Sequence, residues 1–103
     1  VVITTTVENK EQAYKLSRQL VENKYVACAN VVGPIMSFFP WEGKQEEDEE
    51  YKLFLKTWAE QWDALLEFCR REHPYDVPEF TMLEANKMQP EYQKWMGEVI
   101  ESK

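Results

Sequence analysis

The residues with the clearest chemical potential stand in one short segment, H-P-Y-D-V-P-E at positions 73–79, which holds the chain's only histidine. Its two prolines predict a rigid turn between a helix and a strand, because each proline ring restricts the backbone. Such a turn would hold the side chains of His73, Tyr75 and Glu79 in set directions. Two interpretations stay open: His73 binds a ligand, or it caps the C-terminus of the helix, where the dipole favours a cation.

The other candidates for metal or pocket chemistry carry weaker signals. Cys28 and Cys69 lie in apolar surroundings and in no CxxC pair, which is typical of reduced core thiols. The acidic run at 46–50 could attract cations, but a solvated loop is the simpler interpretation, since adjacent carboxylates alone do not close a coordination shell. Trp41 and Trp95 could line a pocket or anchor a core or an interface. No Ser or Cys stands in an activating context, so we expect no catalysis.

Local signals locate the elements that must position these residues. The β-branched run at 1–6 predicts a strand, and capping boxes at 9–12 and 57–60 predict two helix starts. The long strand-like run at 25–39 should bend at Gly33-Pro34. Pro74 should end the second helix, and Pro90 suits the first turn of a third. We also expect a polar hairpin loop at 41–50 and strands at 51–57 and 80–85.

The resulting order, β-α-β-β-α-β-α, predicts an α+β fold of the ferredoxin-like, split βαβ type. It would be a sandwich with an antiparallel sheet, helices on one face and an added C-terminal helix. We expect residues 1–103 to form a single domain. Apolar residues point to both faces of the strand at 26–39, so we expect a second subunit to cover the open face.

Composition and charge narrow the partners. The 103 residues carry a formal net charge of −7 and are 44% hydrophobic. Affinity for nucleic acids comes mainly from basic side chains that neutralise phosphates. Because this chain is acidic, we expect no nucleic-acid binding. No segment approaches the roughly 18 apolar residues of a membrane span, and no signal peptide is recognisable. A cytoplasmic location is the expectation, with a preceding targeting or anchor segment left open.

Several motifs, in order along nearly the whole chain, resemble one family. Residues 73–79 match HPYxxPE, and residues 27–30 (A-C-A-N) are similar to an ACxN segment. Residues 41–44 (W-E-G-K) resemble a W-x-G-K hairpin, residues 56–57 a K-T pair, and residues 92–95 a YxxW segment. The chain thus resembles the CutA (CutA1-like) divalent-cation tolerance proteins.

This resemblance implies a homotrimer in which the second and third strands interlock, and a link with divalent-cation tolerance, above all copper. It implies no catalysis and no cofactor required for folding; copper(II) or another divalent cation would be the ligand. It also implies a similarity to the PII signalling trimers. The matching positions for a cleft between subunits are Lys56, His73, Tyr75, Glu79 and Trp95.

The chain also departs from the family pattern. Some members carry a cysteine in the first strand and two histidines before the proline, where this chain has Thr4, Glu72 and His73. These are harder ligands, so a metal held by Glu72 and His73 should bind more weakly and less selectively. Two alternatives stay open: a PII-like regulator that binds a small anion through Lys56, and a trimeric scaffold for partner proteins.

Overall fold

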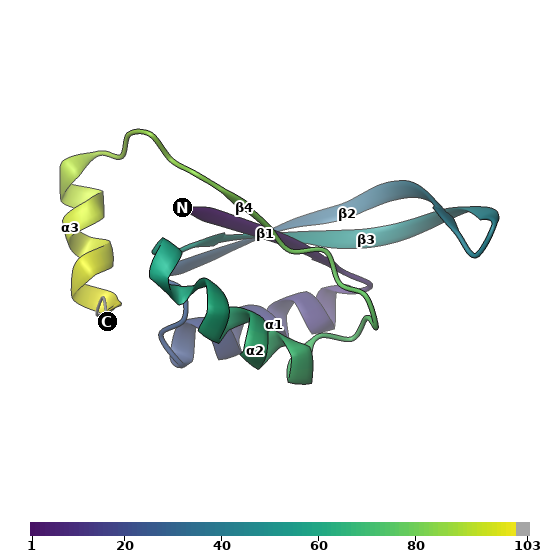
Figure 1. The fold of residues 1–103 in the computed structure, drawn as a ribbon, viewed down its shortest axis with the longest axis horizontal. Helices are drawn as coiled ribbons and strands as arrows, with labels where there is room; N and C mark the ends of the chain where they lie inside the picture. The colour runs from purple at the N-terminus through teal and green to yellow at the C-terminus, as the bar shows by residue number, and fades with distance from the viewer. Residues whose placement is uncertain (101–103) are drawn as a thin grey trace.

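A computed structural model describes residues 1–100. The elements follow the predicted order, in two interleaved βαβ units and a last helix (Figure 1). They are β1 (Val2–Val7), α1 (Lys10–Glu22), β2 (Cys28–Trp41), β3 (Lys44–Lys56), a 3-10 turn (Ala59–Gln61), α2 (Trp62–Glu72), β4 (Thr81–Leu83) and α3 (Pro90–Val99). None of these helices is long and apolar enough to cross a membrane.

The four strands form one antiparallel sheet in the order β2-β3-β1-β4. Helices α1 and α2 lie side by side on one face of it (Figure 1). This arrangement confirms the predicted α+β fold with an antiparallel sheet and a C-terminal helix. Alternate residues of a strand point to opposite faces, so each strand presents one set of side chains to the helices and another to the open face.

The core lies between the sheet and these two helices. Its side chains come from every second residue of the central strands and from one stripe of each helix, as periods of 2 and 3.6 residues require. Fully or almost fully buried members are Ile3 and Val7 of β1, Leu53 and Leu55 of β3, Leu16 and Leu20 of α1, and Leu65 and Cys69 of α2.

The β2–β3 hairpin extends well beyond the rest of the molecule (Figure 1). The expected bend at Gly33-Pro34 is confirmed, since the pairing register shifts between Val32 and Ile35. The expected loop at 41–50 is wrong: residues 44–50 are strand, and only Glu42 and Gly43 form the turn, with φ of 51° and 79°. Two central residues with positive φ form a tight hairpin turn whose twist matches that of the flanking strands. The acidic run can therefore pair with β2 as part of β3.

The local signals at three other points were partly wrong. Asn9 caps α1 by accepting from the Gln12 backbone N–H, but the Gln12 side chain turns to Glu8 and completes no box. Thr57 caps nothing, because its hydroxyl donates to the carbonyl of Tyr25. The fourth strand is only three residues long, as it pairs with β1 alone at the sheet edge.

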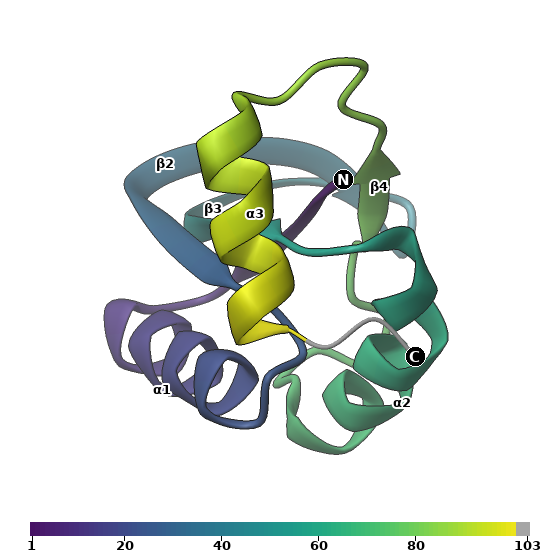
Figure 2. The same cartoon turned by 90° about the vertical axis from the view of Figure 1, so that its left-hand side faces the viewer.

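Helix α3 stands across one end of the sheet and does not join the helical layer (Figure 2). Gln89 caps its start through the Tyr92 N–H, with Pro90 in the first turn as predicted. Met96 and Ile100 are buried against Ala27 in a second, smaller core. Trp95, which could have lined a pocket or anchored a core or an interface, is 41% exposed.

Candidate functional site

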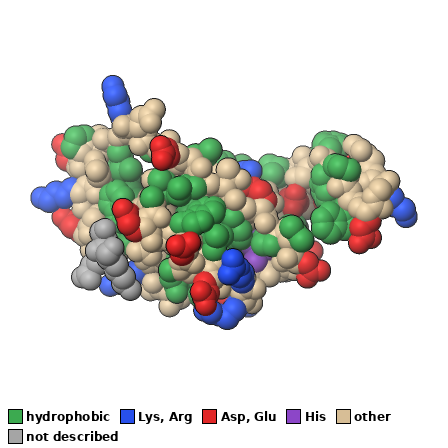
Figure 3. Space-filling model, viewed as in Figure 1, with side chains coloured by type: hydrophobic (Ala, Val, Ile, Leu, Met, Phe, Trp, Pro, Cys, Tyr) green, Lys and Arg blue, Asp and Glu red, His purple; other side chains and the backbone are tan. Residues whose placement is uncertain are grey.

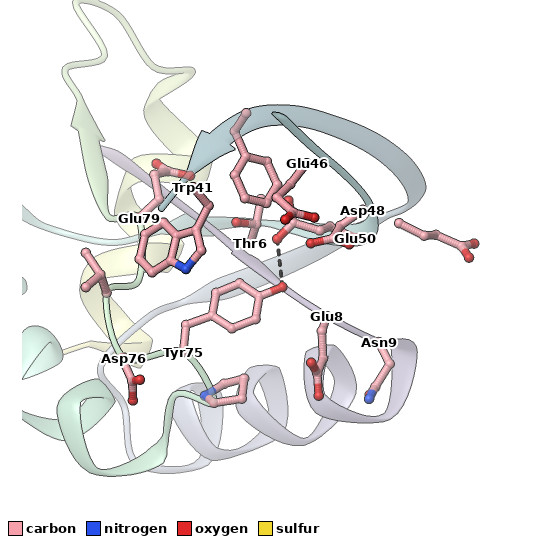
Figure 4. A pocket seen from close by; sticks show the side chains of 14 residues that line it. Thr6, Glu8, Asn9, Trp41, Glu46, Asp48, Glu50, Tyr75, Asp76 and Glu79 are labelled. Carbon is pink, nitrogen blue, oxygen red and sulfur yellow. Dashed lines mark hydrogen bonds between the residues drawn. The ribbon is translucent and has the colours of Figure 1, made fainter. Parts of the chain in front are cut away.

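A hollow of about 760 Å³ opens between the projecting hairpin, the start of α1 and the turn after α2 (Figure 4). Seven of its fourteen lining residues are acidic, and none is Lys or Arg. The acidic residues are Glu8, Glu46, Asp48, Glu49, Glu50, Asp76 and Glu79. Three aromatic residues, Phe39, Trp41 and Tyr75, share the lining. Since walls of one charge sign focus the field, the hollow favours cations.

One hydrogen bond joins the turn after α2 to the hairpin. The Tyr75 hydroxyl donates to Glu50 Oε2 at 2.7 Å, although the two residues are 25 positions apart (Figure 4). Glu50 is only 7% exposed. Burial, followed by the hydrogen bond and charge of Glu50, raises the pKa of Tyr75 well above its usual value. Tyr75 therefore stays protonated and keeps donating to the carboxylate.

His73 lies under the turn and faces the core. Its Nδ1 accepts the Tyr75 backbone N–H at 3.1 Å, and its Nε2 lies 3.1 Å from the Thr5 hydroxyl. The ring packs against the rings of Tyr75 and Phe80. Because a backbone N–H can only donate, Nδ1 must carry the lone pair, so the proton of the neutral ring is on Nε2. Burial lowers the pKa of His73, partly offset by the Thr6 backbone and the Glu50 charge.

The two residues predicted as metal ligands lie in different surroundings. His73 follows the last residue of α2, at the capping position, and its backbone N–H bonds to the Cys69 carbonyl. Glu72 is exposed. A metal at His73 would have to displace Thr5 or Tyr75 from the ring. No group of three or more His, Cys, Asp or Glu side chains within residues 1–100 is arranged to hold a metal, so one chain offers no preformed centre.

Glu79 lies on the open face of the sheet, at the edge of the hollow. Its Oε2 accepts from the hydroxyls of Thr4 at 3.0 Å and Thr81 at 2.7 Å. Its Oε1 lies 3.6 Å from Lys52 Nζ. Thr4 pairs with Thr81 across β1 and β4, so the carboxylate joins the two strands where β4 begins. Thr4, the position of a cysteine in some resembling proteins, is thus a hydrogen-bond donor here.

Lys56 and Trp95 lie elsewhere. Lys56 Nζ is 5.8 Å from the Tyr92 ring centroid, and the rings of Tyr92 and Trp95, both on α3, lie 5.4 Å apart. Lys56 is six residues from Glu50 along β3, which is about 20 Å of extended strand. The structure therefore brings Tyr75 and Glu79 to the same hollow and places His73 beneath Tyr75 on the core side. It keeps Lys56 and Trp95 at the opposite end of the sheet.

Sequence reasoning missed Thr5, and it named Glu50 only as part of an acidic run that could attract cations. Glu50 stood at the end of an acidic run that looked like a loop, and Thr5 stood in an ordinary β-branched strand. The only sequence signal for either was alternation: residues 51, 53 and 55 alternate with polar neighbours, and extending that period backwards would have placed Glu50 in the strand.

The open face of the sheet and the hairpin carry exposed apolar side chains. Val32, Met36 and Phe38 of β2 are 48%, 56% and 63% exposed, and Leu83 of β4 is 52% exposed. Figure 3 shows hydrophobic side chains at the surface of the hairpin. Exposed apolar clusters of this kind mark interaction surfaces.

The β2-β3-β1-β4 sheet, the two helices on one face and the long hairpin define an α+β protein of ferredoxin-like topology. The sequence model of the CutA1 divalent ion tolerance protein family matches residues 1–99. The chain therefore belongs to the CutA1 divalent ion tolerance protein family.

Individual relatives agree with this assignment. "Protein CutA homolog" of Xenopus laevis is 41% identical over 95 residues, which are 92% of this chain and 63% of that protein. "Divalent-cation tolerance protein CutA" of Thermococcus kodakarensis is 36% identical over 100 residues, or 97% and 95% of the two chains. The chain thus spans less than two thirds of the frog relative and nearly all of the archaeal one.

Solved structures superpose closely. CutA1 from Oryza sativa has a TM-score of 0.94 at 37% identity, covering 98% of this chain and 94% of its own. CutA1 from Pyrococcus horikoshii has a TM-score of 0.92 at 35% identity, covering 98% of both.

Proposed function

We propose that this chain is the subunit of a homotrimer that binds divalent cations, copper(II) among them, and has no catalytic role. The observation that carries the proposal is the carboxylate-rich hollow beside the 73–79 turn, in a chain of a family described by divalent ion tolerance. Seven acidic side chains without a basic one raise the local concentration of cations.

The trimer is supported by the apolar open face. A sheet with helices on only one face leaves the other to solvent or to a partner. Here Val32 and Leu83 are exposed on that side, one on each edge strand, and Met36 and Phe38, beyond the register shift, are exposed on the projecting hairpin. Two apolar edges on one chain suit a head-to-tail contact that closes into a ring.

The metal would be bound by oxygen donors of the hollow. Glu72 and His73 do not line it, and they would join the site after opening of the turn that follows α2 and of the hydrogen bonds of His73. Such hard donors give modest selectivity, and copper(II) should still bind more tightly than zinc(II), as the general order of divalent metals predicts. Binding to the folded chain alone would stabilise it without being needed for folding.

The test is isothermal titration of the metal-free protein with copper(II), zinc(II) and buffer alone, with the mass measured by light scattering. Glu46→Gln/Asp48→Asn should weaken binding, since both residues line the hollow. The matched control, Glu84→Gln/Glu98→Gln, removes the same charge from exposed residues outside it. His73→Gln reports whether the histidine takes part. A trimer that binds neither metal, or equal binding by both double variants, would overturn the metal proposal; a monomer would overturn the trimer.

A second candidate function is binding of a small anion by a PII-like regulator. It is favoured by Lys56, whose ammonium lies over the Tyr92 ring and forms no ion pair within residues 1–100. Lys56→Gln should then abolish anion-induced melting shifts and leave copper(II) titrations unchanged.

A further inference from the structure

Helix α3 is joined to the rest of the molecule by little packing. Its buried side chains, Met96 and Ile100, lie in a small core of their own against Ala27, apart from the main core between the sheet and the other two helices. Within residues 1–100, no backbone hydrogen bond or ion pair links residues 89–100 to another segment. Elements with few buried apolar contacts open locally at a lower free energy than the whole protein unfolds.

The segment that leads to α3 also stands away from the body of the protein. Residues 84–87 are all exposed, and a cleft of about 300 Å³ is lined by residues 58–60 and by residues 85–88. Figure 2 shows α3 outside the layer formed by α1 and α2. A helix of ten residues is marginal in water without packing, and Gly97 lowers its intrinsic stability further. Once it leaves the sheet, α3 should therefore also unfold.

Two functional side chains lie beneath α3. Cys28 and Lys56 are directly opposite each other in β2 and β3, so both point to the same face of the sheet. Lys56 Nζ is 5.8 Å from the centroid of the Tyr92 ring of α3. Burial raises the pKa of Tyr92, and the neighbouring Cys28 thiol adds to this shift. Tyr92 thus lies against both side chains, which are half-buried.

We propose that α3 is a lid, which opens by local unfolding while the sheet, α1 and α2 stay folded, and which then uncovers Lys56 and Cys28. The use of this lid rests on the second candidate function. The Tyr92 ring occupies one side of the Lys56 ammonium, so a small anion binds there when the ring moves aside. A lid that is closed most of the time reduces the apparent affinity for the anion by the open fraction.

Labelling of the two cysteines distinguishes opening of the lid from unfolding of the whole chain. Cys28 lies against Tyr92, whereas Cys69 of α2 is fully buried in the main core. The intact protein is treated with iodoacetamide at pH 8, and mass spectrometry follows each thiol. We expect Cys28 to be alkylated at least about tenfold faster than Cys69, because local opening requires less free energy than global unfolding.

Two substitutions in α3 change the stability of the lid in opposite directions. At Gly97 a new Cβ would meet no atom within 4 Å, so Gly97→Ala should slow the labelling of Cys28 about fivefold, the usual advantage of Ala over Gly in a helix. Met96→Ala removes a fully buried anchor and should speed it by about tenfold or more. The matched control is Ala64→Gly, on the exposed side of α2, which should leave the labelling of Cys28 unchanged.

Two results of these labelling experiments would overturn the lid. A Cys28 rate that changes in neither Gly97→Ala nor Met96→Ala would show that a second subunit or the sheet itself, and not α3, limits access to the thiol. Equal acceleration of Cys28 and Cys69 in Met96→Ala would show that α3 opens only when the whole chain unfolds.

A titration with inorganic phosphate keeps the lid and the anion function apart. If phosphate binds, Lys56→Gln should abolish binding, and Gly97→Ala should weaken it about fivefold because the open fraction falls. Equal affinity of Gly97→Ala and the unmodified protein would overturn the role of the lid at Lys56. Absence of phosphate binding in the unmodified protein would refute the anion function and its gating, while the labelling rates still decide whether α3 opens on its own.

Discussion

The hydrogen bond between Tyr75 and Glu50 offers the sharpest test of how the site is built. Tyr75→Phe keeps the ring and deletes only the hydroxyl, which donates at 2.7 Å to a carboxylate that is 7% exposed. Hydrogen bonds to charged groups contribute about 1.5–3 kcal/mol, and loss of the donor leaves the carboxylate under-satisfied. Because the hollow is open and water can replace part of the donor, we expect a loss of about 1.5 kcal/mol in the free energy of unfolding.

The assay is denaturant unfolding followed by tryptophan fluorescence, at one fixed protein concentration because assembly would add to the apparent stability. Tyr25→Phe is the matched control: Tyr25 is also half-buried, and its hydroxyl makes no hydrogen bond within residues 1–100. Combining Tyr75→Phe with Glu50→Gln closes a double-mutant cycle, for which we expect a coupling of about 1 kcal/mol. Additive effects of the two substitutions, within about 0.5 kcal/mol, would refute the reasoning.

Three further predictions follow from the packing. Gly33→Ala should destabilise the protein by about 1–3 kcal/mol, because the new Cβ would clash with the Tyr51 ring. An unchanged unfolding midpoint would show that the ring moves freely. Stability should fall as the pH drops below about 6.5, because burial lowers the pKa of His73 in the folded state, so that the unfolded chain binds more protons than the folded one. In melting temperatures measured from pH 7 to pH 5, His73→Gln should flatten this dependence. A slope equal to that of the unmodified protein would assign the dependence to other groups. Cys69, whose pKa burial raises to about 12, should resist alkylation at pH 8 until the protein unfolds, as mass spectrometry would report; rapid labelling of the native protein at Cys69 would contradict its burial.

Much of the architecture was predictable because it depends on local rules. The Asn9 cap, Pro90 in the first turn of α3 and the register shift at Gly33-Pro34 each follow from the backbone limits of single residues. The core position of Cys69, predicted from its apolar neighbours, is confirmed by its burial. A local signal failed where a distant group offered another hydrogen bond. The Thr57 hydroxyl donates to the carbonyl of Tyr25, 32 residues away, and therefore does not cap the expected helix.

The sequence by itself determined the order of the elements, the rigid 73–79 turn and the negative charge of the chain, since composition and short-range backbone preferences suffice for these. Only the tertiary structure decided how the turn is used. Strand pairing placed Glu50 opposite Ile35 and within reach of Tyr75, and the same packing turned His73 toward Thr5. It also carried Lys56 to the far end of β3. The physical reason is that strand register is set by pairing between distant segments, so no local pattern states which side chains will meet.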